Sequence, residues 1–207
     1  MSEPKVASVV FDIGGVLLDW SPDYLYAELI PDAAEREHFL TNIATPDWNR
    51  QQDAGRSWAE AVAELTSVHP EHAEWIEAYD KGWLKMVNGV IQGTADLLTE
   101  LRDQQLPTYA LTNFSEDKWA VAKEAFPILD GFVGEVVSGR EQTIKPDEKI
   151  YRILLERYDL DPARTFYTDD VRHNVDGARA VGIDAELFVG ADTLRRQLRE
   201  RGLPLHP

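Results

Sequence analysis

The sequence contains no cysteine among its 207 residues. Without thiols, the chain can form neither disulfides nor thiolate metal sites. Basic residues are also scarce, because 21 Lys and Arg stand against 37 Asp and Glu and give a formal charge of -16 at pH 7. General nucleic-acid binding needs clustered cations that displace counterions from phosphates, so this balance argues against it. A single anionic ligand stays compatible if a cation and a few local basic groups invert the field at its site.

The sequence also lacks an apolar run long enough to span a membrane. Met1 to Pro4 are polar and lead directly into a predicted strand, with no basic region or apolar signal segment. We therefore expect a cytoplasmic protein without a membrane partner. Whether it is a monomer or a homodimer stays open.

Hydrophobic residues make up 43% of the chain, enough for a sizeable core. The β-branched run over residues 6–11 predicts a central strand that is apolar on both faces. Later strands are expected over residues 107–111, 132–137, 165–168 and 185–189, with helices between them. Such alternation predicts a parallel sheet with right-handed crossovers. The predicted fold class is therefore α/β, with a Rossmann-like parallel sheet core flanked by helices.

Strand patterns are missing from residues 20–88. Helical periodicity appears there over residues 24–29, 58–65 and 75–86, with prolines between the helices. We expect an inserted α-helical cap over residues 20–88 and a core formed by residues 1–19 and 89–207. Within the core, Thr94 and Ser115 are predicted to start helices and Gly182 to follow the end of one.

Asp12 ends the predicted central strand and is followed by Gly14 and Gly15. Open α/β sheets bind ligands beyond the carboxyl ends of their strands. The two glycines let the backbone turn sharply and approach a ligand. A carboxylate held there can serve as nucleophile, metal ligand or both. The alternative is a simple turn in which Asp12 bonds its own backbone.

Other predicted strand ends also carry reactive groups. Thr112 and Asn113 follow the second core strand, Lys145 follows the third, and Asp169 and Asp170 end the fourth. Taken singly, such residues fit turns, solvated cations or helix caps. Their joint placement at successive strand ends instead predicts that they converge on one crevice.

In this order, Asp12, Thr112, Lys145 and the Asp169-Asp170 pair resemble the four motifs of the haloacid dehalogenase-like (HAD) hydrolase superfamily. The insert over residues 20–88 resembles its helical type 1 cap. The Asp-x-Gly-Gly-Val form is similar to a branch that includes sugar-phosphate phosphatases such as α-glucose-1-phosphate phosphatase. The resemblance implies a Mg²⁺-dependent phosphomonoester hydrolase whose partner is a small phosphorylated substrate, with sugar phosphates among the candidates.

The resemblance also implies catalytic roles for these residues. Asp12 would attack phosphorus and form an aspartyl phosphate. Thr112 and the backbone N–H of Asn113 would bind phosphate oxygens, close to Gly15. Lys145 would neutralise charge near Asp12 and on the transferring group.

The implied cofactor is Mg²⁺, which prefers oxygen ligands. By resemblance, Asp12, Asp170 and the carbonyl of Gly14 would hold the ion, and Asp169 would be a ligand or lie behind the ligands. Asn174 stands where many relatives carry another Asp, so it adds no charge to this site.

Gly14 departs from the family pattern. Most phosphatases of the superfamily carry a second Asp at this position, which protonates the leaving group and then activates water. General acid–base help is typically worth about 10²- to 10⁴-fold, so its loss predicts slow turnover or a preference for good leaving groups. His173, Glu141, the cap and ordered water are candidate replacements.

In the cap, residues 48–50 and 55–56 resemble the specificity loop that folds over the substrate. Arg50 is a candidate substrate-binding residue because its planar fork can bind an oxyanion or sugar hydroxyls. The alternative is that Arg50 pairs with Asp47 or Asp53.

Two other functions stay open. A 2-haloacid dehalogenase shares the fold and an Asp nucleophile but attacks carbon and needs no metal, and the Asp169-Asp170 pair argues against it. A catalytically weak module that binds a phosphometabolite or a protein is the second alternative, because Gly14 removes a catalytic group.

Overall fold

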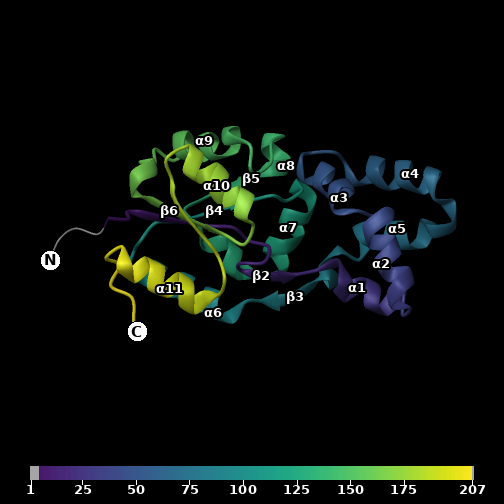
Figure 1. The fold of residues 1–207 in the computed structure, drawn as a ribbon, viewed down its shortest axis with the longest axis horizontal. Coiled ribbons are helices and arrows are strands. Elements are labelled where there is room, and N and C mark those ends of the chain that lie inside the picture. The colour runs from purple at the N-terminus through teal and green to yellow at the C-terminus, as the bar shows by residue number, and fades with distance from the viewer. Residues whose placement is uncertain (1–4, 207) are drawn as a thin grey trace.

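A computed structural model of the chain describes residues 5–206 and divides into a sheet-containing lobe and a helical lobe (Figure 1). The polar segment Met1 to Pro4 therefore lies outside the described residues. Within residues 5–206, no helix combines the length and apolarity needed to cross a membrane.

The core lobe is built on a five-stranded sheet in which every neighbouring pair is parallel, as predicted. The strand order is β5-β4-β1-β6-β7. The strands are β1 (Ser8–Phe11), β4 (Thr108–Thr112), β5 (Gly134–Val137), β6 (Thr165–Asp169) and β7 (Asp184–Leu187). The central β1 has β4 and then β5 on one side, and the chain crosses over after β5 to place β6 and β7 on the other. This point is where parallel α/β sheets open a crevice for ligands.

Helices cover both faces of this sheet, because alternate residues of β1 point to opposite sides. Val9 and Phe11 belong to a cluster with α6, α7 and α11, whereas Val10 belongs to a cluster with α9 and α10. The covering helices are α6 (Gln92–Asp103), α7 (Glu116–Ala125), α9 (Glu148–Arg157), α10 (Arg172–Ala180) and α11 (Ala191–Glu200). Shorter turns are α8 (Ser138–Glu141), η3 (Pro127–Gly131) and η4 (Pro162–Arg164).

The cap lobe is helical, as predicted, and its own core is rich in aromatic side chains. Tyr79 contacts the rings of Tyr26, Trp48 and Trp58 at centroid distances between 5.2 and 6.0 Å. Its elements are α1 (Pro22–Leu29), α2 (Ala33–Asn42), α3 (Pro46–Asp53), α4 (Trp58–Val68), η1 (Pro70–His72), α5 (Ala73–Lys81) and η2 (Trp83–Met86). The helix expected over residues 75–86 is therefore wrong at its end. A Cβ at Gly82 would lie 2.8 Å from the Ala78 carbonyl oxygen, so the chain turns there in tight packing.

Two short strands that the sequence did not predict join the lobes. β2 (Leu18–Trp20) pairs antiparallel with β3 (Val87–Val90), and Trp20 lies opposite Val87. The predicted cap boundaries at residues 20 and 88 fall inside these strands. Strands of three and four residues are too short to show an alternating pattern.

Helix ends test the local predictions. Thr94 is buried inside α6, which begins at Gln92, so its predicted capping role is wrong. Ser115 is the N-cap residue of α7 as predicted, but its hydroxyl accepts a hydrogen bond from Trp58 Nε1 at 2.9 Å instead of capping the helix. Gly182 follows α10 with φ +89°, as expected for a glycine after a helix end.

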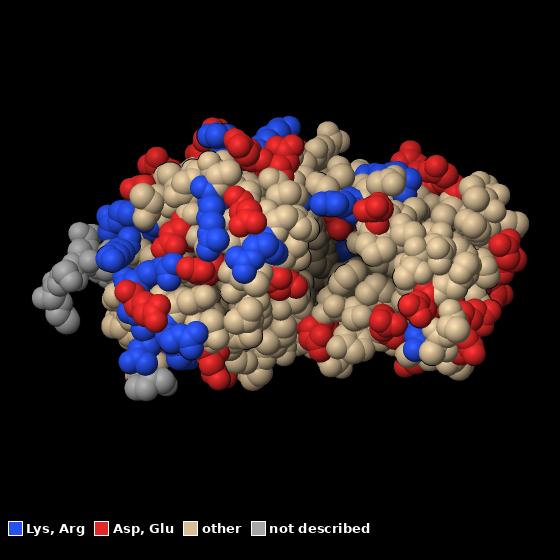
Figure 2. Space-filling view, in the orientation of Figure 1, with Lys and Arg blue, Asp and Glu red and all other residues tan. Residues whose placement is uncertain are grey.

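The lobes touch around a hollow that Figure 2 shows between them. Ser138 Oγ of the core donates to the Asp53 carbonyl of α3 at 2.5 Å. Lys118 of α7 pairs with the Asp80 carboxylate of α5, and its Nζ lies 5.1 Å from the centre of the Trp58 ring. These contacts hold the cap against the amino end of α7.

Removing the Lys118 ammonium should loosen the cap. In Lys118→Met, the half-buried Asp80 carboxylate loses its charged donor, an interaction typically worth about 1.5–3 kcal/mol. We expect amide hydrogen exchange in α5 and at the start of α4 to accelerate about 10- to 100-fold. Lys149→Met, at an exposed position of α9, is the matched control. Unchanged protection in the Lys118 variant would mean that this pair does not hold the cap.

Candidate active site

A cavity of about 380 Å³ lies between the lobes. Core and cap both contribute to its lining. The core supplies Asp12, Gly14, Gly15, Thr112, Asn113, Phe114, Ser115, Lys118, Lys145, Asp170, Val171 and Asn174. The cap and its junction supply Trp20, Asn49, Asp53, Trp58 and Trp83. The reactive groups predicted at successive strand ends therefore meet at one place.

Asp12 directly follows β1 and is only 7% exposed. Its backbone N–H donates to the Thr168 carbonyl at 3.0 Å, which continues the pairing with β6. Its Oδ1 accepts from the backbone N–H of Ile13 at 2.7 Å and pairs with Lys145 Nζ at 2.8 Å. One carboxylate oxygen is thus fixed by two donors.

Lys145 is 1% exposed and links three core strands. Its Nζ contacts Asp12 after β1 and donates to Asp169 Oδ2 at the end of β6, at 2.7 Å. It also donates to the Leu111 carbonyl of β4 at 3.1 Å. The side chain of Asn113 holds the Lys145 backbone, because its Oδ1 accepts from Lys145 N at 2.8 Å and its Nδ2 donates to Lys145 O at 3.2 Å. Two residues singled out by sequence therefore position each other.

Asp169 is fully buried and accepts from four donors. Besides Lys145, these are the Tyr167 hydroxyl, the Val171 backbone N–H at 2.8 Å and Asn174 Nδ2 at 3.1 Å. A carboxylate has about four lone-pair sites, so these bonds occupy it. Asp169 is thus best suited to orient Lys145 from behind the pocket.

The ionisation of this cluster follows from burial and from Lys145. Burial, and then the charge of Asp169, raise the pKa of Asp12 despite the attraction of Lys145. Burial would also raise the pKa of Asp169, but the charge and hydrogen bond of Lys145 outweigh it and the pKa is lowered. For Lys145, burial alone would lower the pKa, but Asp12 and Asp169 outweigh it and raise it. The lysine is therefore charged.

Three acids form the group that could hold a metal ion. One oxygen each of Asp12, Asp169 and Asp170 lies within 4.8 Å of the others. Burial and the charge of Asp169 raise the pKa of the Asp170 carboxyl. With all three ionised, Lys145 balances only one of the negative charges, and a divalent cation would balance the rest. The all-oxygen donor set suits Mg²⁺.

The two glycines after Asp12 differ in their surroundings. Gly15 has φ +72°, and a Cβ on it would lie 2.3 Å from Asp170 Oδ2. A Cβ on Gly14 would meet no heavy atom within 4 Å. The absent side chain at position 15 therefore makes room for an acid of the site, whereas position 14 faces open space.

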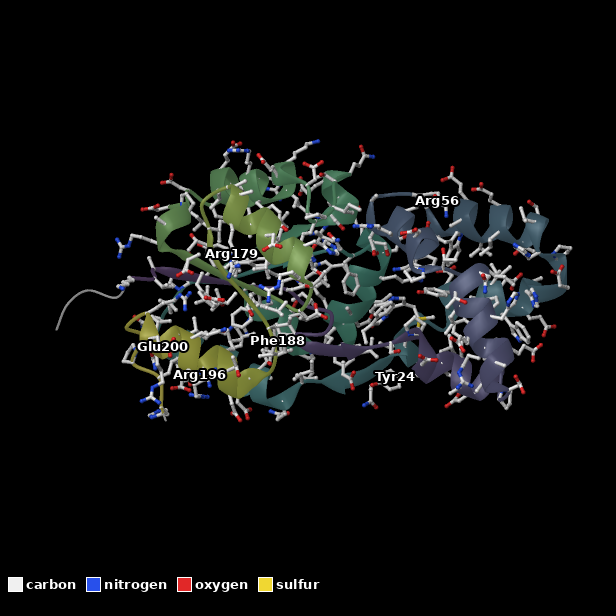
Figure 3. All side chains as sticks on the ribbon, viewed as in Figure 1. Tyr24, Arg56, Arg179, Phe188, Arg196 and Glu200 are labelled. Atoms are coloured by element: carbon white, nitrogen blue, oxygen red, sulfur yellow. The ribbon has the colours of Figure 1, made fainter. Side chains whose placement is uncertain are left out.

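Other predicted residues lie elsewhere. Arg50 is exposed and does not line the cavity, so its substrate-binding role stays a prediction without a contact. His173 is exposed and Glu141 pairs with Arg157 at 2.8 Å, and neither lines the cavity. Arg56, labelled in Figure 3, stays on the cap, where its Nε donates to Gln52 at 2.8 Å.

Asp53 is a lining residue that the sequence did not single out as functional. It ends α3 and faces the cavity from the cap. Burial raises the pKa of its carboxyl to about 7, although the backbone N–H of Ser115 and the charges of Lys145 and Arg50 oppose the rise. The sequence offered no signal beyond an acid in a polar helix.

The model of the haloacid dehalogenase-like hydrolase family matches residues 6–182. This chain belongs to that family of hydrolases. The four strand-end motifs and the cavity described above all lie within the matched range. The resemblance drawn from the motifs is confirmed at the level of the superfamily.

Similar proteins include a curated phosphatase. The sesquiterpene phosphatase astK of Aspergillus oryzae is 26% identical over 179 residues, which cover 85% of this chain and 86% of that protein.

Solved structures share the fold. The HAD family enzyme bt-2542 of Bacteroides thetaiotaomicron, solved as a magnesium complex, aligns with a TM-score of 0.74 at 23% identity, over 94% of this chain and 99% of that one. The L-2-haloacid dehalogenase of Xanthobacter autotrophicus aligns with a TM-score of 0.63 at 18% identity, over 98% of this chain and 85% of that one. The same fold thus occurs in a magnesium-bound enzyme and in a haloacid dehalogenase.

Alanine at the two glycines should have opposite effects. Gly15→Ala combines a positive φ with overlap onto Asp170, and we expect a loss of about 1–3 kcal/mol in unfolding free energy. Gly14→Ala meets open space without a positive φ, so reduced freedom of the unfolded chain should leave it neutral or more stable by up to about 1 kcal/mol. Urea unfolding of both variants measures the difference. Equal stability would contradict the crowding at Gly15.

The raised pKa of Asp53 makes folding pH-dependent. Its folded pKa of about 7 exceeds the ordinary 3.8, so the native state loses stability as pH rises through this window. Asp53→Asn removes this loss. We expect the stability of the variant relative to wild type to grow by about 2 kcal/mol between pH 5.5 and pH 8, at about 1.36 kcal/mol per pH unit below pH 7. Urea unfolding at both pH values tests this, and a constant difference would contradict it.

Proposed function

We propose that this protein is a Mg²⁺-dependent phosphomonoester hydrolase that works through an aspartyl phosphate on Asp12. One observation carries the proposal: the buried Asp12 carboxylate lies beside both the Lys145 ammonium and the Asp170 carboxylate on the wall of an inter-lobe cavity. A nucleophile, a fixed cation and a metal-binding acid thus share one space. The family membership and the curated phosphatase relative support the same conclusion.

Asp12 would attack the phosphorus and displace the alcohol. Its Oδ1 is held by Ile13 N–H and Lys145, which leaves Oδ2 for attack or for the metal. Lys145 would neutralise charge on the transferring phosphoryl group, because its side chain is already oriented by Asp169. Preorganised charges of this kind need no rearrangement during the reaction.

Phosphate oxygens would be bound at the end of β4. Thr112 and Asn113 line the cavity there. The Asn113 side chain is engaged with the Lys145 backbone, so its backbone N–H is the group proposed to face the phosphate. Gly15 lines the same cavity, and its lack of a side chain leaves room there for Asp170.

Mg²⁺ would be held by Asp12, Asp170 and the Gly14 carbonyl, with Asp169 behind them. When bound, the ion polarises phosphoryl oxygens and lets an anionic nucleophile approach an anionic phosphate. The magnesium complex of the bt-2542 enzyme supports this choice of metal.

The cavity walls favour a substrate with an apolar part. Trp20, Trp58, Trp83 and Phe114 line it, and sugar hydroxyls would need polar partners in their place. The sesquiterpene phosphatase relative supports the same direction. We therefore place apolar phosphate monoesters ahead of sugar phosphates, which stay in the test panel.

A dehalogenase is the competing function, since the fold is shared. The three clustered acids favour the phosphatase, because attack on carbon by a carboxylate requires no cation to balance Asp170. A module that only binds its ligand would not need a buried carboxylate held beside a lysine, as Asp12 is held beside Lys145.

Phosphate release should require Asp12 and Mg²⁺. With a panel of prenyl phosphate, sugar phosphates, nucleotides and an activated aryl phosphate, we expect Asp12→Asn to lower kcat by at least about 10³-fold. Chelation of Mg²⁺ should abolish turnover, because the clustered carboxylates would then repel the phosphate. Asp176→Asn, at an exposed position of α10, is the matched control.

Two results would overturn the proposal. Undiminished release by Asp12→Asn would remove the nucleophile. Metal-independent halide release from 2-haloacids, with no phosphate release across the panel, would instead establish the dehalogenase.

A further inference from the structure

The proposed reaction leaves one proton unassigned. When the bond from phosphorus to the leaving oxygen breaks, that oxygen must gain a proton, and Gly14 has no side chain to supply it. Among the replacements considered from the sequence, His173 and Glu141 do not line the cavity, whereas the cap contributes to its lining. The donor must therefore be sought among the groups that do.

Within residues 5–206, three carboxyl groups line the cavity: Asp12, Asp53 and Asp170. Asp12 is the proposed nucleophile and Asp170 a proposed metal ligand. Asp53 remains, and it comes from the cap, opposite the strand ends of the core.

The Asp53 carboxyl is held in place by both lobes. Its backbone carbonyl accepts from Ser138 Oγ at 2.5 Å, which ties the end of α3 to the core. Asn49 Nδ2, one turn earlier in α3, donates to Asp53 Oδ2 at 3.3 Å. The backbone N–H of Ser115, on the core, favours the ionised form of the carboxyl. Contacts of this kind restrict the position of a side chain, as a catalytic group requires.

The charged and titratable groups around Asp53 come from several elements. Lys145 and Arg50 attract its ionised form, and Lys118 lines the same cavity. Burial, followed by the charge of Asp53, raises the pKa of the Tyr79 phenol, which stays neutral. Burial outweighs the attractions on Asp53 and raises its pKa to about 7, where an acid–base catalyst is most effective.

We propose that Asp53 is the general acid and base of the reaction and acts from the cap in place of the acid missing at Gly14; this inference rests on the proposed phosphatase function. In the first step, Asp12 bonds to phosphorus, the bond to the leaving oxygen breaks, and the Asp53 proton moves to that oxygen to give the alcohol. In the second step, the Asp53 carboxylate takes a proton from water as the water oxygen bonds to phosphorus. The bond to Asp12 then breaks, inorganic phosphate leaves, and Asp53 is protonated again.

The dependence on the leaving group tests this role. A poor alkoxide leaving group needs the proton, whereas an activated phenolate does not. In Asp53→Asn, we expect kcat/KM for an alkyl phosphate to fall about 10²-fold or more, and kcat/KM for an aryl phosphate to fall less than about tenfold. Asp47→Asn, an exposed acid on the same helix, should leave both values unchanged.

Two further readouts separate catalysis from a structural role of Asp53. The second step loses its base in Asp53→Asn, so the variant should release a burst of one phenol per enzyme and accumulate phosphorylated Asp12. The wild-type kcat/KM for the alkyl ester should fall above about pH 7 as Asp53 ionises, and the variant should lack this fall. The substrate phosphate titrates equally in both proteins.

A second substitution that restores activity would show that the Asp53→Asn variant is folded. Position 14 faces open space, so Asp53→Asn combined with Gly14→Asp should regain at least about tenfold of the lost alkyl phosphate activity. Equal losses for both esters, without a burst, a change in pH profile or rescue, would overturn the Asp53 role while the phosphatase stands. Absence of any Asp12-dependent phosphate release by the wild type would overturn both.

Discussion

The contact of the Lys145 ammonium with two carboxylates is the interaction on which the rest of this site depends. Lys145 is buried, so its charge is tolerated only because Asp12 and Asp169 compensate it. Removing one partner would leave an uncompensated charge in the interior, typically at a penalty of about 3–5 kcal/mol. The strand ends of β1, β4 and β6 are therefore held in one arrangement by electrostatics as well as by the sheet.

A layer of polar groups behind the cavity keeps this arrangement exact enough for chemistry. Tyr167 and Asn174 fill the remaining acceptor sites of Asp169, and Tyr151 in turn donates to the Asn174 carbonyl at 2.7 Å. These hydrogen bonds restrict the side chains of the network, because breaking one would leave a buried polar group unsatisfied. With these side chains fixed, the three clustered acids keep a net negative charge beside Lys145, which a divalent cation would balance.

The cap contributes what the core lacks. Core residues provide Asp12, the proposed nucleophile, and the Lys145 ammonium, whereas residues of the cap and its junction provide aromatic side chains and the Asp53 carboxyl. On the face shown in Figure 2, basic side chains gather over the core lobe and acidic ones dominate the cap. A site completed by two lobes can exclude water from the phosphate when the lobes meet, and can release product when they part.

The sequence by itself determined the parallel sheet, the helical insert and the convergence of Asp12, Lys145 and Asp170, because buried strands leave a strong pattern and every strand end in such a sheet meets one edge. It did not reveal β2 and β3, whose few residues show no periodicity. Nor did it identify Asp53, whose environment comes from a contact with Ser138 across 85 residues. Only the tertiary structure decided which polar side chains are desolvated. Burial at the junction of two lobes depends on residues far apart in the sequence, so no local sequence pattern indicates it.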